Sequence, residues 1–114
     1  MALFAVSAYA ENASWLRYPS ISPDGKSVAF SYKGDVYVVD SEGGEARQIT
    51  SNPAYDYSPV WSPDGKTVVF ASDRYGNFDI YKVSVDGGVP VRLTTHSAKE
   101  TPWTFTPDGK NILF

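Results

Sequence analysis

Short apolar runs separated by turn residues make up almost the whole chain, and none has the spacing of an amphipathic helix. The runs that end near Ile21 and Trp61 are both followed by Pro-Asp-Gly-Lys, a turn in which proline fixes φ and glycine takes a positive φ. Further strands follow, the last of each unit after a double glycine: 26–31, 36–39 and 47–50 in the first unit, and 66–71, 78–85 and 91–94 in the second. We therefore predict an all-β protein of four-stranded antiparallel units.

One nine-residue motif occurs three times, as SPDGKSVAF at 22–30, SPDGKTVVF at 62–70 and TPDGKNILF at 106–114. The Pro-Asp-Gly triplets are 40 and 44 residues apart, and a period in this range is typical of β-propeller blades. The four extra residues of the second unit fall between its second and third strands, so we expect them in a loop. The sequence then holds a β-propeller segment of two complete blades and the first half of a third.

The second strand of each unit is apolar on both faces. One face carries two apolar residues per unit, Val28 and Phe30, Val68 and Phe70, Ile112 and Phe114, and the other carries Ala29, Val69 and Leu113. A sheet that is apolar on both faces must be covered on both, and stacking between neighbouring blades is one arrangement that covers them.

The motif spacing divides the chain into 1–17, 18–56, 57–100 and 101–114, which we interpret as a leader remnant with the N-terminal segment, two blades and half a blade. Propellers usually have about four to eight blades, so we expect a fragment of a longer protein, or a piece that several copies complete by association. The second strand of the half blade would be an exposed edge. We therefore also expect self-association through that edge.

Three motifs carry a resemblance to a known repeat: Ser/Thr-Pro-Asp-Gly-Lys, Asp-Val/Ile-Tyr at 35–37 and 79–81, and Gln-Ile-Thr or Arg-Leu-Thr at 48–50 and 92–94. Over 18–114 the sequence resembles the TolB-type, WD40-like β-propeller repeat. That repeat occurs in periplasmic TolB, in the N-terminal propellers of tricorn-type serine proteases and in prolyl oligopeptidase relatives. The motifs are specific for the fold, whereas the same blade serves many functions.

The resemblance implies two functions. In tricorn-type proteases the propeller is non-catalytic and filters peptides toward a separate serine peptidase domain, whereas TolB-like propellers dock envelope proteins. The segment 11–17 is too short for the small domain that precedes the propeller of TolB, which favours the tricorn order. We therefore predict a non-catalytic segment that binds or gates polypeptide, with TolB-like docking as the alternative. Nothing in the residues supports a third role, that of a propeller lyase.

Charge and composition exclude several classes of function. The formal charge is −3 and the basic residues are scattered, whereas nucleic-acid binding needs clustered Lys and Arg. There is no cysteine for disulfides or thiolate metal sites, and no apolar run long enough for membrane insertion. Residues 1–10 are uncharged and end in Ala8-Tyr9-Ala10, the pattern before a signal-peptidase cut. We expect an exported protein, periplasmic or extracellular, with an ordinary N-terminal strand as the alternative interpretation of this segment.

No residue pattern indicates catalysis, a cofactor or a metal ion. His96 is the only histidine, and no Gly-x-Ser-x-Gly motif accompanies it. Asp73, Asn77 and Asp79 lack the spacing and the terminal glutamate of a calcium loop. A pair between Asp73 and Arg74, or a turn cap, accounts for these polar residues better. We predict no catalytic residue, no cofactor and no metal site.

Binding is expected at the end of the blades opposite the Pro-Asp-Gly-Lys turns, where the variable loops and the links between blades meet. We call this the variable end; its segments are 32–34, 52–57, 73–78 and 96–103. Exposed loops on a rigid scaffold are usual recognition sites, and aromatic residues are enriched here. The candidate contacts for an extended peptide or a protein partner are Tyr55, Tyr57, Asp73, Arg74, Tyr75, Phe78 and Trp103. The alternative for each aromatic ring is to seal the gap between blades.

Overall fold

The computed structural model describes residues 17–94, 102 and 104–114, and within these ranges it has ten strands and no helix that could cross a membrane. The first four-stranded sheet consists of β1 (Arg17–Ile21), β2 (Ser27–Tyr32), β3 (Asp35–Asp40) and β4 (Arg47–Gln48). The second consists of β5 (Asp56–Trp61), β6 (Thr67–Tyr75), β7 (Asn77–Ser84) and β8 (Val91–Arg92). A hairpin of β9 (Thr104–Phe105) and β10 (Ile112–Leu113) follows.

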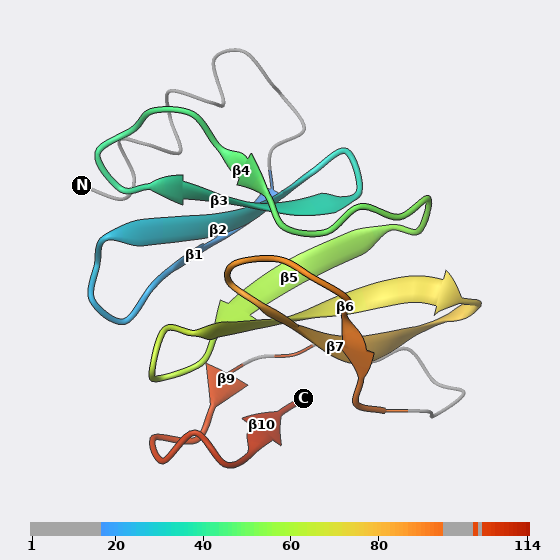
Figure 1. The fold of residues 1–114 in the computed structure, drawn as a ribbon. Coiled ribbons are helices and arrows are strands. Elements are labelled where there is room, and N and C mark those ends of the chain that lie inside the picture. The colour runs from blue at the N-terminus through green and yellow to red at the C-terminus, as the bar shows by residue number, and fades with distance from the viewer. Residues whose placement is uncertain (1–16, 95–101, 103) are drawn as a thin grey trace.

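The strands of each sheet pair antiparallel in sequence order, and the sheets stack one on the next, with the first uppermost in Figure 1. β5 lies against both β1 and β2, so the second sheet contacts the first through its first strand. The prediction of two complete propeller blades followed by the first half of a third is confirmed. We refer to the two sheets as the first and second blade.

The four extra residues of the second blade lengthen a hairpin, which differs from the expected loop. β6 continues to Tyr75 and pairs with β7 through Ser72 and Asp79 and again through Tyr75 and Asn77. A shift of register between these pairs absorbs the surplus residues as a bulge, and Gly76 makes the tight turn with a φ of 104°. Backbone pairing satisfies more hydrogen-bonding groups than an open loop, which explains why the strands extend.

The fourth strands are shorter than the pattern predicts, because the backbone leaves the regular ladder after two residues. In the first blade, the amides of Ile49 and Thr50 both donate to the carbonyl of Val36, at 2.9 and 3.3 Å. The Thr50 hydroxyl in turn accepts the Val36 amide at 2.9 Å. The Thr94 hydroxyl accepts the Ile80 amide in the same way in the second blade, at 3.0 Å. The threonine of each Gln-Ile-Thr or Arg-Leu-Thr motif therefore closes the outer edge of its blade.

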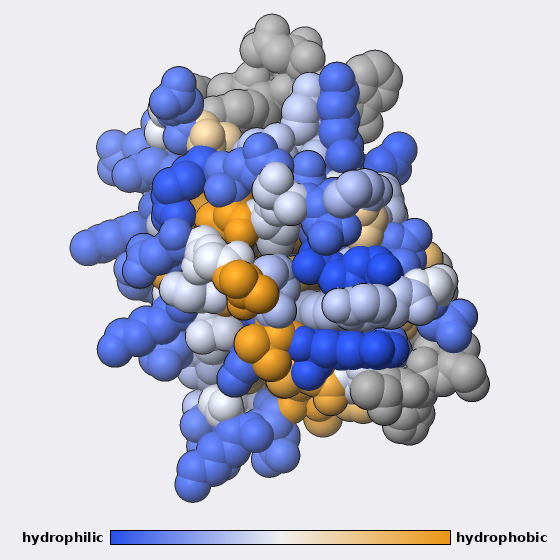
Figure 2. Space-filling model, turned by 45° about the vertical axis from the view of Figure 1, so that its right-hand side comes forward, coloured by the Kyte–Doolittle hydropathy of each residue, from blue (hydrophilic) through white to orange (hydrophobic). Residues whose placement is uncertain are grey.

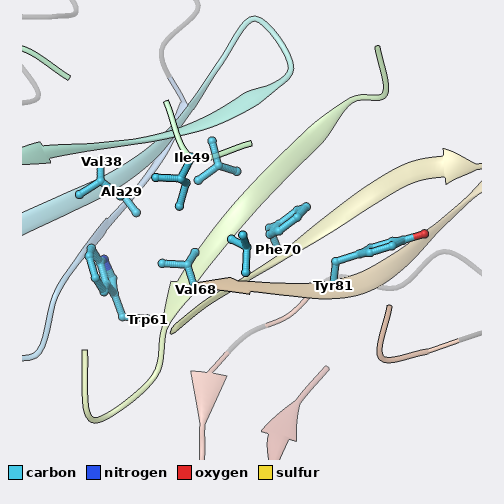
Figure 3. Packing of buried hydrophobic residues seen from close by; sticks show 9 residues of the cluster. Ala29, Val38, Ile49, Trp61, Val68, Phe70 and Tyr81 are labelled. Atoms are coloured by element: carbon cyan, nitrogen blue, oxygen red, sulfur yellow. The ribbon is translucent and has the colours of Figure 1, made fainter. Parts of the chain in front are cut away.

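The main hydrophobic core lies between the two blades. Figure 3 shows side chains from the first blade facing those of the second: Ala29, Val38 and Ile49 on one side, and Trp61, Val68, Phe70 and Tyr81 on the other. Val28 and Phe30 belong to a separate cluster on the opposite face of the first blade. The expectation that β2 and β6 are buried on both faces is thus confirmed.

Each Pro-Asp-Gly-Lys turn is closed by the same small hydrogen-bond network. In the second blade the Ser62 hydroxyl donates to Asp64 Oδ1 at 2.6 Å, and the Lys66 amide donates to the same oxygen at 3.0 Å. Gly65 has a φ of 72°, a conformation that a side chain would strain. These hydrogen bonds lower the pKa of the Asp64 carboxyl below its ordinary value of 3.8. The bond from the Ser62 hydroxyl contributes most, and the bond from the Lys66 amide is second.

We expect Ser62→Ala to raise the pKa of Asp64 toward 3.8. The folded-state pKa lies below the unfolded value, so the turn contributes stability above about pH 4 that is lost as the pH falls through the folded-state value. An NMR titration of the carboxyl carbons measures this shift, and Asp24 in the unaltered first turn serves as the internal control. An unchanged pKa for Asp64 would contradict the role assigned to the serine.

The first strands of the two blades, β1 and β5, each contain a bulge. Tyr18 and Ser58 both have a φ of 56°, and the pairing register shifts at each of them. Pro19 and Pro59 follow directly, and proline is tolerated because each strand is the edge of its sheet. Each bulge therefore occurs at the same point of the repeat.

Candidate binding surface

Antiparallel topology brings the β2–β3 turn, the link between the blades and the β6–β7 hairpin to one end of the stack. Two hydrogen bonds from backbone amides fix the link there: the Asp56 amide donates to the Gly34 carbonyl at 2.8 Å, and the Tyr55 amide donates to the side chain of Asp73, at Oδ1, at 2.8 Å. Asp73 therefore binds the link, whereas the sequence suggested a pair with Arg74 or a turn cap. These contacts hold the variable end to the strands.

Four aromatic rings pack together at the variable end. Tyr57 lies at the centre, 5.0 Å from the ring of Phe78, 5.5 Å from Tyr55 and 5.4 Å from Tyr18. Tyr57 is only 6% exposed, so it fills space between the blades, whereas Tyr55 is 41% exposed and Phe78 is half-buried. Of these rings, Tyr55 and Tyr18, which is 44% exposed, have accessible surface.

Arg74 forms a buried ion pair across the second blade. One of its terminal nitrogens, Nη2, lies 3.1 and 3.0 Å from the two carboxylate oxygens of Asp56, and its Nε donates to the Ser72 hydroxyl at 2.9 Å. The Asp56 side chain is fully buried and that of Arg74 is 10% exposed. The guanidinium also lies over the ring of Tyr81, with Cζ 4.9 Å from the ring centre. The ion pair fixes the base of the hairpin.

A ladder of rings and guanidinium groups runs outward from the core. The rings of Phe70 and Tyr81 are stacked at 6.0 Å, and those of Tyr81 and Tyr75 at 6.4 Å. Arg92 closes the ladder, with its Cζ 5.1 Å from the ring centre of Tyr75. Tyr75 is 70% exposed, so its ring is accessible although its neighbours hold it in place.

The two blades differ at one polar position next to this ladder. In the second blade Arg92 pairs with Asp79, to which its Nε donates at 3.1 Å. In the first blade Gln48 takes that place and donates to Asp35 at 3.1 Å. The hydrogen bond and the charge of Asp79 raise the pKa of Arg92. The repeat could have indicated the Asp79–Arg92 pair, because Asp35 and Asp79 occupy one motif position and Gln48 and Arg92 occupy another.

Three residues of this surface were absent from the sequence-based candidates: Asp56, Tyr81 and Arg92. Burial raises the pKa of the Tyr81 phenol, while the nearby Arg92 and Arg74 act in the opposite direction. Of the predicted candidates, Trp103 lies outside the described residues, as does His96. The described residues contain no group of three or more side chains suited to a metal ion.

Comparisons with known proteins agree with the propeller fold of this chain. The structure aligns with that of a putative TolB from Agrobacterium tumefaciens with a TM-score of 0.76 and 37% identity, covering 88% of this chain and 38% of that one. It aligns with the tricorn protease with a TM-score of 0.71 and 27% identity, covering 85% and 10% of the two chains. An uncharacterized peptidase of Bacillus subtilis, YuxL, is 43% identical over 56 residues, which are 45% of this chain and 8% of that protein.

The chain thus spans less than two fifths of the length of these similar proteins. The match to a family is broader, since residues 13–114 fit the tricorn protease N-terminal beta propeller domain. This range includes both complete blades and the half blade, together with all three copies of the Pro-Asp-Gly-Lys motif. The repeat, the blade topology and this match agree, and the chain belongs to the family of the tricorn protease N-terminal β-propeller domain.

Proposed function

We propose that this propeller segment is non-catalytic and that its variable end binds or gates polypeptide. The observation that carries the proposal is the pair of accessible tyrosines, Tyr55 and Tyr75. Tyr55 is held by the ring of Tyr57 and by the hydrogen bond from its backbone amide to Asp73, and Tyr75 by the ring of Tyr81 and the guanidinium of Arg92. Rigid, amphipathic aromatic side chains lose little entropy on binding and are enriched at protein interfaces. Both tyrosines come from the segments in which the sequence placed the contacts.

For the whole protein, we propose that the propeller admits extended peptides to a separate serine peptidase domain. The family match to the tricorn propeller and the similarity to a Bacillus peptidase support this.

We also propose export, supported by the Ala8-Tyr9-Ala10 pattern and by the similarity to TolB. For the segment by itself, we also propose self-association through β10, where Leu113 is 50% exposed and the adjacent Phe114 is 60% exposed.

Replacement of Tyr75 tests the binding proposal. We expect Tyr75→Ala to weaken binding to an array of short unstructured peptides about tenfold, the effect of removing one accessible aromatic contact. Ile21→Ala, an exposed apolar residue of β1 outside the variable end, is the matched control and should bind as the unchanged protein does. Equal binding by both variants would show that the variable end is not the binding face.

Docking of folded envelope proteins is the second candidate, because the structural similarity to a putative TolB is higher than that to the tricorn protease. The two candidate functions differ in whether the bound partner is unfolded or folded. A gating propeller selects extended polypeptides, so denatured substrate proteins should compete with the array peptides. A docking scaffold would instead bind a folded partner whose unfolded form does not compete.

A further inference from the structure

A cleft of about 450 Å³ lies beside the aromatic and guanidinium ladder. Its walls come from the link after β4, from the β6–β7 hairpin and from the segment leading into β8; the polar side chains that line it belong to Ser51, Asn52, Arg74, Tyr75, Tyr81 and Arg92. Figure 2, which turns the right-hand side of Figure 1 forward, shows strongly hydrophilic side chains layered with paler ones on this side of the molecule. The cleft involves only the two complete blades.

The accessible charge in the cleft is positive. Asp56 and Asp79, which pair with the two arginines, have fully buried side chains, whereas those of Arg74 and Arg92 are 10% and 33% exposed. Each arginine uses Nε and Nη2 for hydrogen bonds, and Nη1 makes none to the described residues. Both guanidinium groups that line the cleft thus retain Nη1 donors that the described residues do not use.

The Tyr81 hydroxyl is a third donor in the cleft. It is buried and has no hydrogen-bond partner within the part of the chain that the structure describes. The first blade serves as an internal comparison, because the hydroxyl of Tyr37, at the same repeat position, donates to Gln48 Oε1 at 3.3 Å. The second blade has Arg92 in place of this glutamine, and a guanidinium cannot accept a hydrogen bond. The exchange therefore leaves Tyr81 with an unpaired hydroxyl beside two arginines.

We propose that this cleft binds a carboxylate group of an extended polypeptide. Donors from three residues, two of them charged, line this cleft, while the Asp79 carboxylate beside them is fully buried with Oδ1 unpaired. A ligand carboxylate supplies two further acceptor oxygens and a negative charge. The accessible ring of Tyr75 then packs against the peptide beside the carboxylate. The inference rests on the proposed polypeptide binding and names the chemistry selected by this cleft, which adjoins the variable end through Asn52, Arg74 and Tyr75. The carboxylate belongs to an acidic side chain or to the C-terminus of the bound peptide, and small probes distinguish these two sources.

An NMR titration of the isotope-labelled protein is the direct test. N-acetyl-glutamate amide carries only a side-chain carboxylate, N-acetyl-alanine only a C-terminal one, and N-acetyl-glutamine amide neither. We expect at least one carboxylate probe to shift the side-chain Nε signals of Arg74 and Arg92, and the neutral probe to leave them unchanged. Equal shifts with the neutral probe, shifts confined to other residues, or tighter binding of inorganic phosphate would overturn the assignment.

Tyr81→Phe separates ligand binding from stability. We expect the effective carboxylate probe to bind this variant roughly tenfold more weakly, the effect of one lost hydrogen bond to a charged acceptor. The melting temperature of the free variant should equal or exceed that of the unchanged protein, because the removed hydroxyl has no partner among the described residues. Tyr37→Phe is the matched control; it loses the bond to Gln48 and should keep the affinity for the probe. Unchanged affinity in Tyr81→Phe would overturn the inference.

Failure of this inference is distinguishable from failure of the proposed function. If array peptides bind through Tyr75 regardless of their acidic content, polypeptide binding stands and the carboxylate site is wrong. If no array peptide binds but a carboxylate probe shifts both arginines, the cleft is an anion site and the proposed polypeptide binding is wrong.

Discussion

Phe70→Ala should lower the free energy of unfolding by about 3–5 kcal/mol, one of the largest effects available in this protein. Phe70 is fully buried between the two blades, where its ring stacks on Tyr81 and lies beneath the guanidinium of Arg74. The truncation removes these contacts and leaves a cavity between two stacked sheets, which cannot easily move together to fill it. Urea unfolding followed by tryptophan fluorescence measures the difference.

Phe114 offers a matched control for that variant. It occupies the same position of the repeated motif, but it is 60% exposed, and within the described residues β10 pairs only with β9. Phe114→Ala should cost less than about 1 kcal/mol, as surface truncations usually do. Similar losses for the two variants would mean that the packing between the blades does not determine the stability.

Asp56→Ala should destabilise the protein by about 3 kcal/mol or more, since it leaves the nearly buried Arg74 without its carboxylate partner. The double variant Asp56→Leu with Arg74→Met should recover most of this loss, because an apolar pair of similar volume has no charge to desolvate. Both changes are measured by urea unfolding, with Glu42→Gln, at an exposed position, as the surface control. A double variant as unstable as the single one would show that the carboxylate has another structural role.

The repeat determines which parts of this fold can be predicted from sequence. Proline and glycine fix the backbone of the Pro-Asp-Gly-Lys turns locally, and the apolar pattern of β2 and β6 directly reports the burial of both faces. These features need no knowledge of distant contacts. The blade count and the position of the variable end followed from them.

The remaining features depend on contacts between distant residues. Asp56 and Arg74 are 18 positions apart and belong to different strands, so no local sequence pattern predicts their ion pair. The residue before a proline normally has an extended backbone, yet Tyr18 and Ser58 take a positive φ because the bulge requires it. The role of Tyr81 could be recognised only by comparing its hydroxyl with that of Tyr37 in the other blade.

Hydrogen bonds tie neighbouring blades together at both ends, since the Asp56 amide also bonds the Gly34 carbonyl across the gap at the variable end. The two ends differ in how the turns themselves accept additional residues. At the Pro-Asp-Gly-Lys end, Trp61 Nε1 donates to the Ser20 carbonyl at 2.8 Å, and Arg47 Nη1 donates to the Val85 carbonyl at 2.7 Å, each across the gap between blades. A longer turn there would displace its neighbour. The β6–β7 hairpin instead accommodates four additional residues through a bulge. Divergence in loop length, and the grafting of foreign segments, should therefore concentrate at the variable end, where new specificity can arise without disturbing the stacking of blades.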